Sequence, residues 1–127
     1  MSKLNIPEGH QAVMPYLMLD NATKFQDFVI AVFDATIKTL HHQPDSKKIM
    51  HAEADIQGSR MMFCDSTTQY PPHPAQLFVY VHHADDTYSK AIENGASSIM
   101  EPKDQDYGRS CGITDICGNI WWITSIA

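Results

Sequence analysis

The sequence lacks the features that mark secreted, membrane-bound and nucleic-acid-binding proteins. It has three cysteines and no CxxC spacing, which fits neither a disulfide framework nor a cysteine-rich zinc site. No stretch approaches about 20 apolar residues, and the N-terminus lacks the apolar core of a signal peptide. The nine Lys and Arg are scattered among fifteen Asp and Glu, so the sequence has no basic cluster that would bind a phosphate backbone or an anionic membrane. We therefore expect a cytoplasmic protein with reduced thiols and neither nucleic-acid nor membrane partners.

What is present is an ordinary globular composition. The chain has 127 residues, of which 43% are hydrophobic and 19% charged. A chain of this length fits one domain, which buries roughly two-thirds of its unfolded surface. We expect one domain over residues 1–127.

Hydrophobic periodicity predicts the same order of elements twice. A strand at 12–19 is followed by a helix at 21–33, with Asn21 as its N-cap, and then by β-rich stretches. The second half has a strand from Gln76, a helix that ends at Gly95, and three more strands. The apolar face of this second helix is formed by Ala84, Tyr88, Ala91 and Ile92. The three later strands of each half are predicted at 35–43, 49–56 and 60–65, and at 97–102, 108–115 and 119–126.

The two halves align as tandem modules. Superposing Leu17 on Val79 matches the strand end and the helix start of both halves without a gap. Each module then reads β-α-β-β-β, with module one at about residues 10–66, a linker at 67–74 and module two at about 75–127. The fold class that follows is α+β.

Five sequence stretches, in register over most of the chain, carry a family resemblance. They are PYLMLDNA with FVIAVFDA, MHAEADI with RMMFCD, FVYVHHADD, ENGA, and KDQDYGRSCGITDICGNIWWI. Together they resemble the vicinal oxygen chelate (glyoxalase/bleomycin resistance/dioxygenase) superfamily, on its PhnB-like branch. The resemblance implies two tandem βαβββ modules that form a cup-shaped mixed sheet with the helices outside. That branch is often labelled 3-demethylubiquinone methyltransferase-like, but the chain has no Gly-rich turn for an adenosyl cofactor, so we do not expect methyl transfer.

The resemblance also implies where a metal would be held. Metal-dependent members carry His or Glu on the first strand and a carboxylate on the last strand of each module. Here Met14, Gln76 and Trp122 take three of those positions, and RMMFC has no carboxylate before Asp65. Because Trp has no lone pair to give and Gln is a weak neutral ligand, we expect no metal and no other cofactor.

The alternation of side chains along the strands predicts which residues face the cup. Leu17 and Leu19 suit the helix-covered core, which leaves the other side of the first strand for the cup. Of the neighbours Trp121 and Trp122, one must face the cup and the other the helix or a partner. Gln105 and Tyr107 lie in the DQ-x-x-G stretch of the family, and Arg109 would neutralise an anionic substrate if it turned inward. The candidate ligand-binding residues are Met14, Tyr16, Met18, Gln76, Phe78, Tyr80, Gln105, Tyr107 and Trp122, with burial in the core or a dimer interface as the alternative.

His51 and Glu53 are the candidate catalytic residues. They share one face of a strand, at a spacing that lets both touch one small molecule. The alternative is a hydrogen-bonded or solvated pair on an exposed face.

Three functions remain open. A metal-independent binder of a small apolar or anionic metabolite or drug follows from the cup with absent ligands. A glyoxalase-type lyase or isomerase would need a metal or the His51–Glu53 pair, and a non-catalytic interaction domain would follow if the aromatic residues were buried between subunits. We also expect a homodimer, because open sheet edges and the little-covered last strand at 119–126 need a cover.

Overall fold

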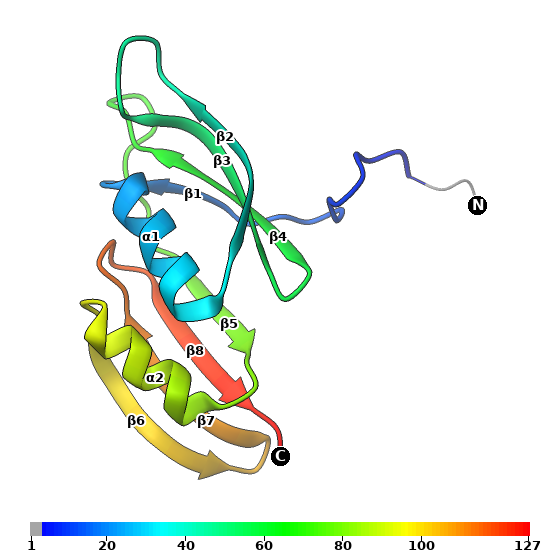
Figure 1. The fold of residues 1–127 in the computed structure, drawn as a ribbon, viewed down its shortest axis with the longest axis vertical. Helices are drawn as coiled ribbons and strands as arrows, with labels where there is room; N and C mark the ends of the chain where they lie inside the picture. The colour runs from blue at the N-terminus through cyan, green and yellow to red at the C-terminus, as the bar shows by residue number, and fades with distance from the viewer. Residues whose placement is uncertain (1–3) are drawn as a thin grey trace.

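The computed structural model describes residues 4–127 and contains the element order expected for module one (Figure 1). Strand β1 (Tyr16–Leu19) leads into helix α1 (Ala22–Phe33), whose N-cap Asn21 accepts a hydrogen bond from the amide of Lys24 at 3.1 Å. Three strands follow: β2 (Thr36–His42), β3 (Ile49–Ile56) and β4 (Ser59–Asp65).

Module two repeats the order. Strand β5 (Gln76–Tyr80) leads into helix α2 (Ala84–Glu93), and β6 (Ser97–Gln105), β7 (Gly108–Thr114) and β8 (Ile120–Ser125) complete it. The N-cap of α2, His83, makes no side-chain capping bond, but Asp85 and Asp86 in its first turn favour the positive end of the helix dipole. The predicted paired βαβββ order is therefore confirmed.

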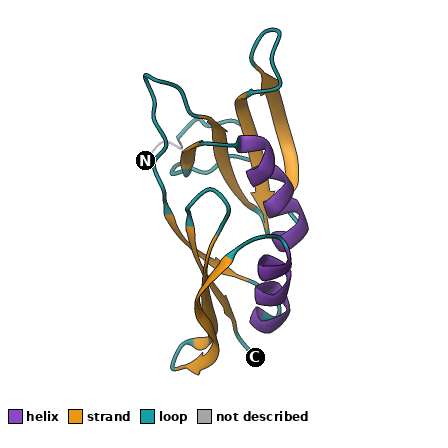
Figure 2. Ribbon diagram, turned by 90° about the vertical axis from the view of Figure 1, so that its left-hand side faces the viewer, coloured by secondary structure: helices purple, strands orange, loops and turns teal. Residues whose placement is uncertain are grey.

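Each module forms its own four-stranded mixed sheet. The strand orders are β1-β4-β3-β2 and β5-β8-β7-β6, so the first strand of each module pairs in parallel with the last. Figure 2 shows the two helices on the same side of the molecule, so each sheet has one helix-covered face and one open face. This arrangement is the α+β fold that the sequence predicts.

The core lies between the sheets and the helices. Phe25 of α1 packs on Phe63 of β4 with ring centroids 5.0 Å apart, and Phe33 packs on Trp121 of β8 at 4.5 Å. Because α1 touches both sheets in this way, and also contacts α2, it joins the cores of the two modules.

Three details differ from the sequence expectation. The first strand begins at Tyr16 rather than at residue 12, since Pro15 has no amide hydrogen to donate to the ladder. Ile92, assigned to the apolar face of the second helix, is 39% exposed. The last strand, β8, lies inside its sheet between β5 and β7, so the edges that need a cover are those of β5 and β6.

Among residues 4–127, no helix combines the length and the apolar character needed to cross a membrane.

Candidate functional site

The open face of module one carries a polar cluster beside sulfur-containing side chains. The register pairs Tyr16 with Met62 and Met62 with Glu53, which places all three on the face opposite the buried Leu17 and Phe63. We use "open face of module one" for Tyr16, Met18, His51, Glu53, Met62 and Cys64.

Glu53 is the centre of the polar cluster. It is 7% exposed, and its Oε1 accepts hydrogen bonds from His10 and from Arg60, both at 2.8 Å. Its Oε2 is 2.9 Å from Nε2 of His51. Burial alone would raise the pKa of Glu53, but the hydrogen bonds from His51, His10 and Arg60 outweigh it and lower the pKa to about 2. Glu53 is therefore a permanent anion near neutral pH and a weak proton acceptor.

The pairing with Glu53 fixes the chemistry of His51. Because a carboxylate can only accept, Nε2 of His51 carries a hydrogen, and in the tautomer that this selects Nδ1 is the acceptor atom. That atom lies 3.4 Å from the hydroxyl of Tyr16, and the two rings meet edge to face at 5.6 Å. Glu53 thus orients a histidine whose second nitrogen lies on the open face beside the Tyr16 hydroxyl.

The N-terminal segment completes the cluster. His10 bonds Glu53, and Gln11 bonds the backbone of Arg60 twice. The Nε2 of Gln11 donates to the backbone oxygen of Arg60 at 2.6 Å, and the Oε1 of Gln11 accepts from the backbone N–H of Arg60 at 3.3 Å. Arg60 also bonds Asp55, its register partner on β3. His10, Gln11 and Arg60 were not predicted from the sequence. The position of Arg60 opposite the acidic residues of β3 was a readable signal, whereas His10 and Gln11 lie outside any periodic element.

The open face of module two is aromatic. Phe78 and Tyr80 of β5 are 52% and 57% exposed, and their rings lie 5.1 Å apart. The ring of Tyr107, from the β6–β7 turn, has its centroid 6.5 Å from that of Phe78. Trp122 pairs with Phe78 across the strands, and its indole N–H donates to Oε1 of Gln76 at 3.1 Å. The fold therefore brings these five predicted residues together.

The two tryptophans point in opposite directions. Trp121 is buried against α1, and its indole N–H donates to Asp115 at 2.8 Å. Trp122 lies over Gly112, where an added Cβ would come within 2.6 Å of its ring. The glycine therefore leaves the space in which this indole lies on the open face.

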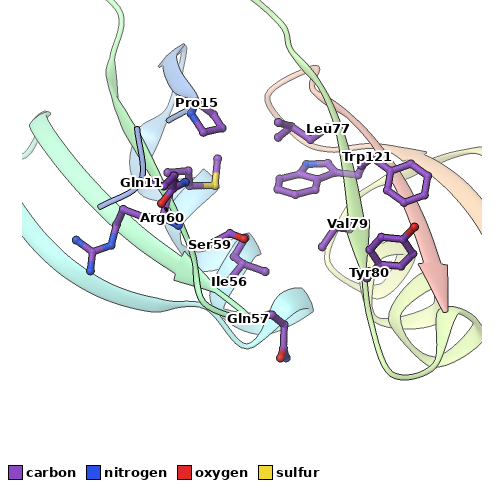
Figure 3. Close-up of a pocket in the computed structure, with 12 residues that line it drawn as sticks. Gln11, Pro15, Ile56, Gln57, Ser59, Arg60, Leu77, Val79, Tyr80 and Trp121 are labelled. Carbon is purple, nitrogen blue, oxygen red and sulfur yellow. Dashed lines mark hydrogen bonds between the residues drawn. The ribbon is translucent and has the colours of Figure 1, made fainter. Parts of the chain in front are cut away.

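Two cavities adjoin these faces. One of about 430 Å³ lies between the modules, with Gln11, Pro15 and Arg60 on one side and Leu77, Val79 and Tyr80 on the other (Figure 3). The other, of about 440 Å³, lies on module one and is lined by Tyr16, Met18, Gln43, Met50, Cys64, Asp65, Thr67 and Tyr70. The cavity that includes Tyr80 does not include Tyr16, so within one chain the two open faces do not share either cavity.

The residues at the inherited metal positions do not fit a metal ion. Gln76 is engaged by the indole N–H of Trp122, and Met14 precedes β1 rather than standing in it. An amide, an indole and a thioether give no charged ligand. Within residues 4–127, His, Cys, Asp and Glu form no group of three placed to hold a metal ion.

Two other predicted residues lie elsewhere. Arg109 bonds Asp85 at 2.9 Å and Asp104 at 3.4 Å, so the inward turn on which its role in neutralising an anionic substrate depended is not present in this arrangement. Gln105 lines a separate polar cavity beside Asp85 and Arg109, at the N-terminal end of α2.

Comparisons with known proteins agree with the fold. The family profile of the Glyoxalase/Bleomycin resistance protein/Dioxygenase superfamily matches residues 12–123. The uncharacterized protein Rv0887c of Mycobacterium tuberculosis (strain ATCC 25618 / H37Rv) is 27% identical over 122 residues, which cover 87% of this chain and 71% of that protein.

Solved structures give the same result. TioX from Micromonospora sp. ML1 aligns with a TM-score of 0.72 and 22% identity over 92% of this chain and 97% of TioX. A Bacillus cereus PhnB protein, described as a putative 3-demethylubiquinone-9 3-methyltransferase, aligns with a TM-score of 0.73 and 19% identity. The alignment covers 91% of this chain and 99% of that protein. TnmS3, an antibiotic binding protein from Streptomyces sp. CB03234, aligns with a TM-score of 0.66 and 15% identity. The alignment covers 93% of this chain and 100% of TnmS3.

Proposed function

Because the chain belongs to the Glyoxalase/Bleomycin resistance protein/Dioxygenase superfamily, we propose that it is a small-molecule-binding protein that works without the superfamily's metal site. The observation that carries this proposal is the pair of open faces, one aromatic and one with a polar cluster. Exposed aromatic side chains with a few oriented polar groups are typical of ligand sites. The antibiotic-binding name of TnmS3 supports the same class of function.

We propose further that the ligand site is completed by a second copy of the chain. Tyr16, Phe78, Tyr80 and Tyr107 are each about half exposed, although such rings normally lose most of their contact with water. Since the two open faces of one chain share neither cavity described above, a dimer that places module one of one copy against module two of the other would cover both.

The charges on these faces indicate the polar group of the ligand. Arg60 is bound to Glu53 and Asp55, and Arg109 to Asp85 and Asp104, so both guanidinium groups are already neutralised. What module one offers is Nδ1 of His51, which accepts a hydrogen bond. We therefore expect a planar, mostly apolar ligand with a hydroxyl or N–H donor to bind better than its carboxylate analogue.

Methyl NMR tests this proposal. Protein labelled with ¹³C at the methionine methyls is screened against planar aromatic compounds, each as a phenol and carboxylate pair. We expect binding compounds to shift the signals of Met18 and Met62, which lie on the open face of module one. Shifts spread over all methionines, or none with any compound, would favour an interaction domain instead.

A second candidate function is proton transfer by His51. The hydrogen-bonded series Tyr16–His51–Glu53 has the arrangement of a base oriented by a carboxylate. If it acts as an isomerase or lyase, bound compounds with an acidic C–H will exchange it for deuterium in D₂O. We expect Glu53→Gln to abolish this exchange but to spare binding; equal exchange rates with Glu53→Gln and the natural protein would contradict the catalytic role.

A further inference from the structure

Three sulfur-containing side chains, those of Met18, Met50 and Cys64, line the 440 Å³ cavity on module one. Met18 and Cys64 are register partners of the parallel β1–β4 pair, so their side chains lie next to each other. The Cys64 thiol donates to the thioether sulfur of Met18 at 3.1 Å. Met50 of β3 lines the same 440 Å³ cavity.

We propose that this cavity is a binding site for a soft monovalent cation, Cu(I) being the biological case, with Cys64 and Met18 as ligands and Met50 as a third. Thiolate and thioether sulfur select Cu(I) over harder ions. The proton that now lies between the two sulfur atoms occupies the place that the cation would take.

The other groups at the cavity favour a soft ion over zinc or magnesium. Asp65 also lines it, but its two oxygens accept hydrogen bonds from the amides of Ala22 at 3.0 Å and Ile49 at 2.6 Å. That carboxylate is therefore committed to the fold, and sulfur is left as the strongest donor. The sulfur pair also needs little rearrangement, because metal–sulfur bonds of about 2.3 Å require the two atoms to move apart by less than about 1 Å.

Binding is an exchange of a proton for the cation. The S–H bond of Cys64 breaks, a metal–thiolate bond forms, and the proton passes to the solvent, with no change in oxidation state. The affinity is therefore expected to rise with pH.

The other two cysteines serve as internal controls. Cys111 is fully buried beneath α2, with its sulfur 4.0 Å from the backbone oxygen of Ala84. Cys117 is half-buried, and its thiol bonds the backbone oxygen of Asn21. Neither contacts a methionine sulfur in these bonds, so neither is expected to hold a cation as tightly.

The test uses Ag(I), a redox-inert probe for Cu(I), added as silver nitrate to the full chain. Native mass spectrometry is expected to show one tightly held ion per chain that Cys64→Ser removes and Cys117→Ser retains. Met18→Leu is expected to weaken binding by about tenfold or more, whereas Met61→Leu, on the core face, leaves it unchanged. X-ray absorption of the natural protein is expected to show at least two sulfur neighbours, a result that needs no variant to fold.

Three outcomes would overturn the proposal. They are retention of the ion by Cys64→Ser, equal affinity of Met18→Leu and Met61→Leu, and a single sulfur neighbour in the absorption spectrum. Each would show that Cys64 and Met18 do not hold the ion together.

Discussion

At the scale of single residues, Glu53 shows how one carboxylate can organise a whole face. Its carboxylate accepts hydrogen bonds from two histidines and an arginine, although the residue is nearly excluded from water. A buried carboxylate without such partners would have a raised pKa, so the low pKa reports the strength of the cluster. The cluster ties the N-terminal segment, through His10, to β3 and β4.

Glu53→Gln is expected to destabilise the fold by roughly 1–3 kcal/mol at neutral pH, because Arg60 and His10 lose a charged acceptor. The pKa of Glu53 is lowered from 4.5 to about 2 on folding, so its stabilising effect is present above pH 4.5 and disappears as the pH falls towards 2. Thermal unfolding measured from pH 7 to pH 2 checks this. The difference between the natural and variant midpoints should shrink below pH 4.5; a difference that stays constant would show that the charge is not responsible.

Trp122 on the open face and Phe28 in the core allow a matched experiment on ligand binding. Trp122→Ala is expected to weaken a compound found in the NMR screen by about 1–3 kcal/mol, because its ring is part of the aromatic open face. Titration calorimetry measures the change. Phe28→Leu, a core substitution on the buried face of α1, is the control and should leave the affinity of the folded protein unchanged. Equal losses in both variants would mean that the effect comes from the fold.

At the scale of elements, the turn between β7 and β8 explains why DICGN has its particular residues. Asp115 accepts hydrogen bonds from the amides of Cys117 and Asn119 and from the indole of Trp121. Asn119 in turn accepts from the amide of Ala75 at 3.0 Å, which ties the turn to the start of β5. The turn thus sets the register of β8, and so decides which tryptophan faces the core.

Gly112→Ala tests the packing of β7 against β8. The new methyl group would lie 2.6 Å from the ring of Trp122, so the ring must swing away from the sheet. We expect a shifted indole emission and weaker binding of the screened compounds, with a loss of stability of about 1–3 kcal/mol. Fluorescence and chemical denaturation check both. A variant that binds as the natural protein does would show that this position of Trp122 is not needed by the ligand.

At the scale of the whole molecule, the exposed faces predict self-association. We expect a dimer in sedimentation, with Phe78→Glu shifting it towards the monomer because a charge would be buried against the partner. Ile92→Glu, an equally drastic change on the exposed side of α2, should leave the dimer intact. A mass near 14.3 kDa at every concentration would reject the dimer and leave the open faces to a ligand or another partner.

The sequence by itself determined the order of elements and the face of most strands, because these follow from local periodicity. The alternation along β3 places Ala52 and Ala54 on the core face and Glu53 on the opposite face, and the helix pattern of α1 predicts its buried phenylalanines. The aromatic face of module two followed in the same way from β5.

Only the tertiary structure decided the partners of those side chains. His10 lies 43 residues from Glu53, and Met18 lies 46 from Cys64, so no local pattern could bring either pair together. The place of β8 inside its sheet likewise depends on the strand order. The turn of Arg109 towards α2 depends on the charge of Asp85, which is far from it in the chain. Periodicity fixes the direction of a side chain, whereas contacts between distant segments fix its chemistry.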